Sequence, residues 1–403
     1  MHDPPAAAER AYFPELDGLR FLAFFLVFGF HGGLPWLADV ISWATLPLFV
    51  LALPFGAAAS EWVADLGPGT DRALRQNGWV GVQLFFVLSG FVITMMLLRE
   101  EARYGRVDLR AFWVRRVLRI WPLYYLTVAL TFFIMPAVDG RMSEPGHVGM
   151  LRAHLPWFLA FLGNWSLIRS GPVGQDEISI LWSVCVEEQF YVLCPLLIVF
   201  VPRRWRLPVV STLMAGSVAV RAWLARGGPQ QAVIQYNTAA QLDTILSGVA
   251  LAMILGGGPG VRLDGRVGRA WTWAVLAGSI WVLTRSELGH RTVGRQTWDF
   301  VAVWAVGVGI VALPVLHDGR ARRWLATGRL VWLGRISYGL YMIHEVGFWA
   351  ARKLLPWTPS RSVPGSVLAL ALTVALAAAS YYGFERPFLR LKRAWTRVPS
   401  RPT

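Results

Sequence analysis

The sequence predicts an all-α fold: a polytopic integral membrane protein with about ten transmembrane helices and additional re-entrant or interfacial segments. Of its 403 residues, 55% are hydrophobic and 16% are charged, and the mean hydropathy is +0.46. A soluble core cannot hold that many apolar side chains. Apolar windows that approach the roughly 20 residues of a spanning helix also recur along nearly the whole chain. We therefore expect the lipid bilayer to be a main partner of the protein.

Arginine is concentrated in short loops between the apolar runs, where it contributes most of the formal net charge of +15. Basic loops of this kind mark the cytoplasmic side of a membrane protein, whereas a nucleic-acid-binding domain gathers its charge on one face. We therefore expect no nucleic-acid partner, and we expect both termini in the cytoplasm. The N-terminal region contains no apolar segment separate from the first span, so we expect no secretory signal peptide.

The first two spans are predicted at 18–36 and 79–98, and the second returns to the arginine-rich loop 99–119. The segment 37–78 between them is apolar but contains two widely spaced prolines within its apolar run. One more single crossing there would place the basic loop on the wrong side of the membrane. We expect this segment to be re-entrant, interfacial or folded back.

The same argument applies to 153–168. A span at 117–136 leaves the cytoplasm and a span at 181–201 ends at the basic sequence RRWR, so the chain lies outside between them. We expect 153–168 to be a second re-entrant piece or a half-helix. The remaining spans are predicted at 208–224, 239–256, 270–284, 298–316, 331–351 and 365–384.

The spans form one predicted membrane domain without an internal repeat. It covers 15–387, preceded by a cytoplasmic tail at 1–14. A basic cytoplasmic tail at 388–403 follows it, and we expect this tail to lie on the membrane surface or to mark a partner site.

The stretch ELDGLRFLAFFLVFGFHGG, at 15–33, carries Arg20 and His31 at the two ends of an apolar run. Polar groups in such a run are costly in hydrocarbon and indicate a functional site. In a helix the two residues share one face and lie roughly 16 Å apart along the axis. Snorkelling to the interface explains Arg20 equally well, but a neutral imidazole is the usual general base near pH 7.

The sequence RRVLR places Arg115, Arg116 and Arg119 at the cytoplasmic end of a predicted helix. Arg116 and Arg119 are three positions apart, so both project from one face. The cluster either anchors the helix on the cytoplasmic side or clamps a phosphorylated ligand, because a guanidinium group offers phosphate a fork of donors.

Glu187 and Glu188, in LWSVCVEEQFYVLCP, lie well inside a predicted span. Adjacent side chains on a helix project about 100° apart, so one carboxylate can face a cavity while the other lies near the interface. Pairing of Glu187 with an intramembrane arginine for folding is the alternative. Cys185 and Cys194 lie about 13 Å apart along the same helix, so we expect neither a disulfide nor a metal site from them.

The sequence WLGRISYGLYMIHE places Tyr338, Tyr341 and His344 along one helical stripe. Packing and hydrogen bonding between helices explain the two tyrosines better than catalysis does, whereas either role fits His344. Gly90 and Gly248 are expected to permit close helix contact.

Five blocks resemble, in order, those of the membrane acyltransferase 3 family: ELDGLRFLAFFLVFGFH, GWVGVQLFFVLSGFVIT, FWVRRVLRIWPLYYL, LWSVCVEEQFYVLCPLL and ISYGLYMIH. The resemblance covers about 14–387. It implies a multi-pass enzyme of the cytoplasmic (inner) membrane of a bacterium that takes an acyl group from cytoplasmic acyl-CoA. Acetyl-CoA is the expected donor, no metal is expected, and the acceptor is a hydroxyl of a sugar, envelope glycan, lipid-linked saccharide or small natural product.

The resemblance implies catalytic roles for His31, Arg20 and Glu187, and donor binding by Arg115, Arg116 and Arg119. The residues expected to contact substrate are Glu188, Trp182, Tyr191, Tyr338 and His344.

Two positions depart from the family pattern. Gln83 stands where Asp is frequent, and Glu345 stands where an apolar residue often follows the histidine. No esterase-like domain follows the membrane part of this sequence, so we expect the chain to complete the transfer alone or to pass its acyl group to a separate partner.

We therefore expect O-acyl transfer in which His31 takes the proton of the attacking hydroxyl and Glu187 orients that imidazole or holds the acceptor. Transfer through an acyl group carried on His31 is a second route. The main alternative is a proton-coupled transporter or flippase of an envelope precursor, with Arg20, His31 and Glu187 along its pathway. A scaffold in an envelope-synthesis complex is a third hypothesis, and it predicts that His31→Ala has no effect.

Overall fold

A computed structural model describes residues 12–32, 34–52, 57–171, 176–227, 231–256, 265–285, 293–359 and 362–396, and these residues form helices and turns without a strand. The first helices are α1 (Pro14–Gly32), α2 (Pro35–Ala52), α3 (Ala57–Ala64), α4 (Leu66–Asn77), α5 (Val80–Tyr104), α6 (Leu109–Ala129), α7 (Met135–Val138), α8 (Pro145–Leu159), α9 (Gly163–Ser170), α10 (Asp176–Ser179) and α11 (Trp182–Phe200).

The second half of the chain continues the helical pattern. Its helices are α12 (Arg203–Arg226), α13 (Gln231–Tyr236), α14 (Thr238–Gly256), α15 (Gly265–Arg285), α16 (Val293–Leu316), α17 (Arg320–Leu325), α18 (Gly328–Arg335), α19 (Ser337–Leu354), α20 (Val363–Ala379) and α21 (Arg386–Ala394). Shorter turns are the π-helical η2 (Leu130–Ile134) and η4 (Ser380–Glu385) and the 3-10 turn η3 (Arg141–Ser143).

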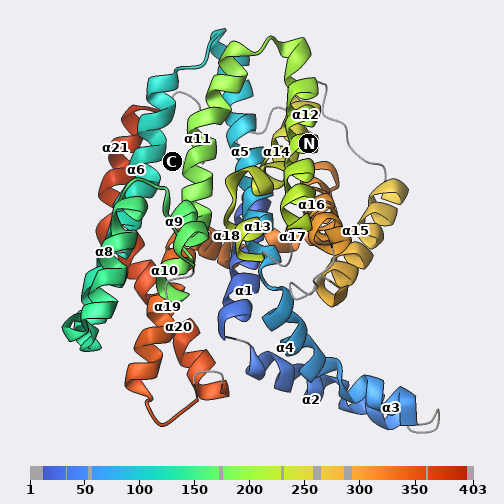
Figure 1. The fold of residues 1–403 in the computed structure, drawn as a ribbon. Coiled ribbons are helices and arrows are strands. Elements are labelled where there is room, and N and C mark those ends of the chain that lie inside the picture. The colour runs from blue at the N-terminus through green and yellow to red at the C-terminus, as the bar shows by residue number, and fades with distance from the viewer. Residues whose placement is uncertain are drawn as a thin grey trace.

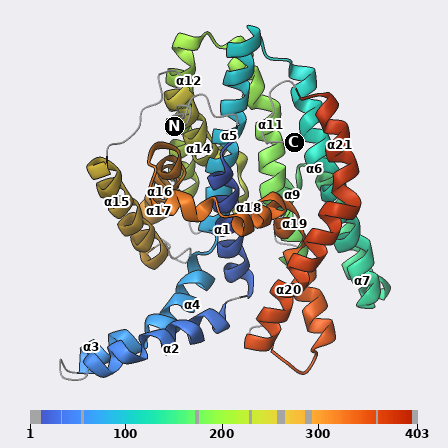
Figure 2. The same ribbon diagram turned by 180° about the vertical axis from the view of Figure 1, so that it is seen from behind.

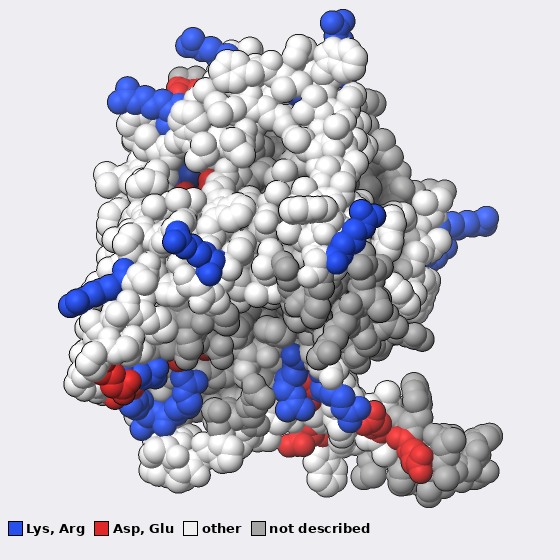
Figure 3. Space-filling model, in the orientation of Figure 1, with Lys and Arg blue, Asp and Glu red and all other residues white. Residues whose placement is uncertain are grey.

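Within the described ranges, seven helices are long and apolar enough to cross a bilayer, or eight if the bent pair Pro14–Gly32 and Pro35–Thr45 is one span. This confirms the predicted all-α, polytopic membrane fold. Two further predicted spans are also helical, since α15 covers 270–284 and α19 covers most of 331–351. Figure 3 shows a face that is mostly uncharged, with Lys and Arg side chains scattered over it.

The segment that follows α1 folds back, which is one of the three paths that the sequence left open. The axis turns by 104° between α1 and the start of α2, and α4 returns beside α2 at the lower end of the bundle (Figures 1 and 2). Asp71 on α4 fixes this corner, because its carboxylate accepts a hydrogen bond of 2.6 Å from the backbone N–H of Leu34.

The segment 153–168 is likewise no single crossing. It comprises the end of α8 and most of α9, which are separated by a break at 160–162. Phe161 in this break has a φ of 56°, a left-handed conformation that bulky residues rarely adopt. Its ring stacks on Tyr124 with the ring centres 4.2 Å apart, and this packing holds the break against α6.

Helix α5 lies in the middle of the bundle and packs against α1, α11, α14 and α16 (Figures 1 and 2). Its tightest contact is with α14. A Cβ atom on Gly90 would overlap the backbone of Ile245, and one on Gly248 would overlap the backbone of Val87. The two glycines therefore let the helices meet at backbone contact, as predicted.

A fully buried ion pair joins α12 to α14. Arg221 Nη1 donates a hydrogen bond of 3.0 Å to Asp243 Oδ1, and neither side chain has exposed surface. The indole N–H of Trp304 on α16 donates to the same carboxylate at 3.1 Å. The guanidinium of Arg221 lies 4.8 Å from the centre of the Phe300 ring. Three spans are thus held together by one compensated charge pair.

We expect Asp243→Asn to lower the free energy of unfolding by about 3–5 kcal/mol, because the variant leaves the buried charge of Arg221 uncompensated. The double variant Arg221→Leu/Asp243→Leu is expected to recover much of that loss. The thermal midpoint of the detergent-solubilised protein measures both effects. An Asp243→Asn variant that unfolds at the wild-type thermal midpoint would contradict the stabilising role of the Arg221–Asp243 pair.

Candidate functional site

A cavity of about 810 Å³ enters the bundle between α1, α5, α6, α11, α19 and α21. This volume falls within the roughly 300–1,000 Å³ of typical ligand pockets. The side chains that line it become more buried from one end to the other. At one end Arg386, Arg390 and Arg393 are exposed. Arg20, Arg116, Arg119 and Glu187 are half-buried, and Ser183 and Tyr341 at the other end are buried. We call the exposed end the mouth and the buried end the inner end.

The lining is strongly cationic. Within the described part of the chain it contains nine arginine or lysine side chains, against the two carboxylates of Asp17 and Glu187. The nine are Arg20, Arg99, Arg116, Arg119, Arg335, Arg386, Arg390, Lys392 and Arg393. Such an excess of positive charge in a concave site favours a ligand that carries several negative charges.

The paired arginines of α6 both line this cavity. The guanidinium of Arg116 lies 5.8 Å from the centre of the Tyr191 ring. That of Arg119 lies 5.7 Å from the Tyr338 ring, and its Nη1 is 3.6 Å from Glu385 Oε2. The rings hold the planar guanidinium groups in place, which prepares them to bind an anion through paired N–H donors.

Arg115, next to this pair, lies outside the cavity lining and has a structural role. It is buried, its Nη2 donates to Glu100 Oε2 at 3.0 Å, and its Nη1 donates to the backbone carbonyl of Trp395 at 2.8 Å. Arg115, which the resemblance assigned to donor binding, thus connects the end of α21 to α6 and does not line the cavity.

Arg20 lines the cavity from α1. Its Nη1 lies 3.2 Å from Asp17 Oδ1 on the preceding turn, and the hydroxyl of Tyr12 donates to the other oxygen of that carboxylate at 2.6 Å. Arg20 is thus one of the cavity cations, and it is also paired with a carboxylate.

Of the two adjacent glutamates, Glu187 faces the cavity. It accepts hydrogen bonds from Ser89 at 2.9 Å and from the hydroxyl of Tyr191 at 2.7 Å. Glu188 lies outside the cavity lining, and its Oε2 accepts from the indole N–H of Trp121 at 2.9 Å. The two carboxylates therefore face different surroundings, as their angular offset on the helix predicts.

Tyr341 lies at the inner end, where its hydroxyl and the Ser183 hydroxyl are 2.6 Å apart. Its backbone carbonyl pairs with Nδ1 of His344 at 2.6 Å. A carbonyl only accepts, so Nδ1 of His344 carries a proton.

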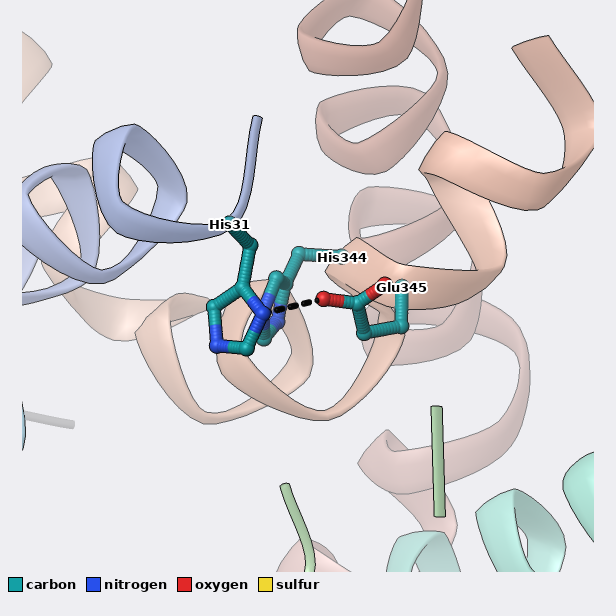
Figure 4. A group of neighbouring side chains, drawn as sticks. All are labelled: His31, His344 and Glu345. Atoms are coloured by element: carbon teal, nitrogen blue, oxygen red, sulfur yellow. Dashed lines mark ion pairs between the residues drawn. The ribbon is translucent and has the colours of Figure 1, made fainter. Parts of the chain in front are cut away.

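His31, His344 and Glu345 come together, as Figure 4 shows. The ring of Tyr341 lies 5.7 Å from that of His344. Nδ1 of His31 lies 2.7 Å from Glu345 Oε1, and Nε2 of His344 lies 3.6 Å from the same oxygen. His344 and Glu345 are buried, whereas the His31 side chain is 21% exposed. The structure thus places Glu345 against His31, whereas the sequence analysis expected Glu187 either to orient that imidazole or to hold the acceptor.

The same three residues form a candidate metal-ligand set, since their ligand atoms all lie within 4.8 Å of one another. Two histidines and one glutamate are a known catalytic zinc set. Two ligands about 2.0–2.1 Å from a tetrahedral zinc lie roughly 3.3 Å apart. The 2.7 Å between His31 Nδ1 and Glu345 Oε1 is instead a hydrogen-bond distance. The geometry therefore favours a hydrogen-bonded pair over a shared ion.

The residues expected to contact substrate divide into two groups. Tyr191 and Tyr338 line the cavity, whereas Trp182 and Glu188 do not. Trp182 packs between the rings of Phe86 and Tyr236 at 5.9 and 5.5 Å. His344 belongs to the cluster with His31.

Two features of the cavity and its surroundings were not predicted from the sequence as parts of one site, although each left a signal. Glu345 is an acidic residue directly after a histidine in a predicted span. The basic residues of α21 recur every three to four positions, which places them on one helix face.

Fold and site together define a class of protein: a polytopic membrane protein with a cationic cavity whose inner end lies beside a histidine–glutamate cluster. Residues 13–382 match the profile of the acyltransferase 3 family, described as an acyltransferase domain. The chain belongs to this family.

Similarity to individual proteins extends over most of the chain. It is 25% identical over 336 residues to O-acetyltransferase OatA of Staphylococcus aureus. The aligned region covers 77% of this chain and 52% of that protein. The chain is 25% identical over 399 residues to peptidoglycan O-acetyltransferase OatA of Listeria monocytogenes, covering 94% and 56% respectively. The chain thus spans about half the length of these relatives. No solved structure matches it.

We expect Arg115→Gln to destabilise the protein by about 3–5 kcal/mol, because Glu100 then remains buried without its counter-charge. Arg116→Gln removes a cavity cation and is expected to leave the thermal midpoint near that of the wild type. Thermal unfolding of the two neighbouring variants, purified in the same detergent, measures the difference. Equal midpoints would contradict the structural role of Arg115.

Proposed function

We propose that the protein is an acyl-CoA-dependent membrane O-acyltransferase that moves an acyl group, acetyl in the first instance, to a hydroxyl of an envelope glycan or related saccharide. The observation that carries the proposal is the cationic cavity. A CoA thioester carries a diphosphate and a ribose phosphate at one end and its reactive carbonyl at the other, which matches a lining that changes from arginine at the mouth to buried hydroxyls at the inner end.

The family and the names of the relatives support acetyl as the group and a cell-wall glycan as the first acceptor to test. OatA of Listeria monocytogenes is named a peptidoglycan O-acetyltransferase. Sugars, lipid-linked saccharides and small natural products with a free hydroxyl follow as further acceptors.

In this proposal, Arg116 and Arg119 bind the donor's diphosphate, with Arg20 beside them. The thioester carbonyl then lies toward Ser183 and Tyr341 at the inner end. The arginine-rich mouth faces the cytoplasm, where acyl-CoA is made, and both termini lie on that side of a bacterial inner membrane. The acceptor approaches His31 from the opposite direction.

His31 is the proposed general base. Its Nδ1 faces Glu345 at 2.7 Å, so Nδ1–H donates to the carboxylate and Nε2 is left to accept a proton. As the acceptor oxygen bonds to the thioester carbonyl carbon, Nε2 takes the hydroxyl proton. The carbon–sulfur bond then breaks, and the departing CoA thiolate recovers that proton from the imidazolium.

The first test is release of free CoA thiol by detergent-purified protein, with acetyl-CoA and a panel of hydroxyl acceptors that includes peptidoglycan fragments. We expect thiol release that depends on acceptor, with an acetyl ester of the acceptor detected by mass spectrometry. Transport of an envelope precursor in proteoliposomes without formation of any ester would instead identify a transporter.

A second test separates the base from the residue that positions it. We expect His31→Ala to lower kcat by about 10²–10⁴-fold, the usual contribution of a general base. Glu345→Gln is expected to lower kcat by a smaller factor and to leave the KM for acetyl-CoA unchanged, because Glu345 lies outside the cavity lining.

Glu345→Asp serves as the matched variant and is expected to retain part of the activity, since it keeps the carboxylate. If the Glu345→Gln variant folds, binds acetyl-CoA and turns over at the wild-type rate, then Glu345 does not position His31 for catalysis.

A further inference from the structure

The C-terminal helix α21 forms one wall of the cavity. The family profile ends at residue 382, before this helix begins. Its end is nevertheless tied to the bundle, because Arg115 Nη1 donates to the carbonyl of Trp395 at 2.8 Å. The guanidinium of Arg110 also lies 5.6 Å from the centre of the Trp395 ring. Figures 1 and 2 show α21 running alongside α6.

The cavity-lining residues of α21 follow a helical repeat. Arg386, Arg390 and Arg393 are spaced by four and three positions, so their side chains lie on one face. All three line the cavity and all three are exposed. The π-helical turn η4 precedes them, and turns of this kind frequently occur at functional sites.

These three arginines differ from the cations deeper in the cavity in their charge environment. Arg20 is paired with Asp17, and Arg119 with Glu385. For Arg386, Arg390 and Arg393, the described residues supply no carboxylate within ion-pair distance. Three guanidinium groups on one face, with no counter-charge among the described residues, form a site suited to phosphate.

From this placement we propose that Arg386, Arg390 and Arg393 bind the phosphate on the ribose of the donor, at the adenosine end of the CoA thioester. The inference rests on the proposed function. With the thioester at the inner end and the diphosphate at Arg116 and Arg119, the ribose 3′-phosphate is the charged group left for the mouth. The C-terminal helix thereby selects CoA over thioesters that lack this phosphate.

The experiment compares acetyl-CoA with 3′-dephospho-acetyl-CoA, which lacks that one group. Binding of each is measured by calorimetry to the full chain in nanodiscs, for wild type and for Arg390→Gln/Arg393→Gln. We expect wild type to bind acetyl-CoA about tenfold or more tightly than the dephospho form, the effect of losing charge-assisted hydrogen bonds. The double variant is expected to bind both ligands with the affinity that wild type has for the dephospho form.

Two matched variants control for charge and folding. Arg204→Gln/Arg323→Gln removes two exposed arginines that do not line the cavity, and we expect it to keep the wild-type preference. Arg390→Lys/Arg393→Lys keeps the charge and is expected to retain part of the preference. Thermal midpoints of all variants report whether the fold is intact.

The outcomes distinguish this inference from the function on which it rests. Wild-type protein that binds both thioesters equally tightly overturns the role of α21 and leaves the acyltransferase proposal standing. A folded Arg390→Gln/Arg393→Gln variant that still prefers acetyl-CoA over the dephospho form also overturns the role of α21. The same conclusion follows if the Arg204→Gln/Arg323→Gln control loses this preference to the same extent. Wild-type protein that binds neither thioester overturns the proposed function and this inference with it.

Discussion

A charged side chain inside a bilayer needs either a counter-charge or a polar cavity, and the arrangement of this protein follows from that constraint. Asp243 supplies the counter-charge of Arg221, and Glu100 supplies that of Arg115. Arg116 faces the polar cavity. Charges that are paired and buried hold helices together, whereas charges that face the cavity are available to a ligand. The same constraint thus separates the structural arginines from those of the site.

The fold was predictable where it depends on hydropathy and on the side of each basic loop. The apolar windows predicted the spans, and parity alone excluded a single crossing by 37–78 or by 153–168. The path of these segments was not predictable, because it depends on contacts between distant residues. The corner after α1, for example, depends on a hydrogen bond between Leu34 and Asp71, and no local pattern encodes that pairing.

The site was predictable where one helix determines it. Spacing on α6 placed Arg116 and Arg119 together, and the angular offset on α11 separated Glu187 from Glu188. Contacts between helices were beyond such reasoning. Arg115 is adjacent to Arg116 in sequence, yet its anchoring role depends on Trp395, 280 positions away. Glu345 lies against His31 because α19 packs against the end of α1, so two residues 314 positions apart form the pair.

The most direct test of the account is a cryo-electron microscopy structure of the protein with acetonyl-CoA. In this donor analogue a methylene group is inserted between the sulfur and the carbonyl carbon, so the acetyl-like group cannot be transferred. The account predicts density for the diphosphate at Arg116 and Arg119 and for the ketone carbonyl beside Ser183 and Tyr341, on the side that faces His31. An analogue bound in the reverse direction, or bound outside this cavity, would contradict it.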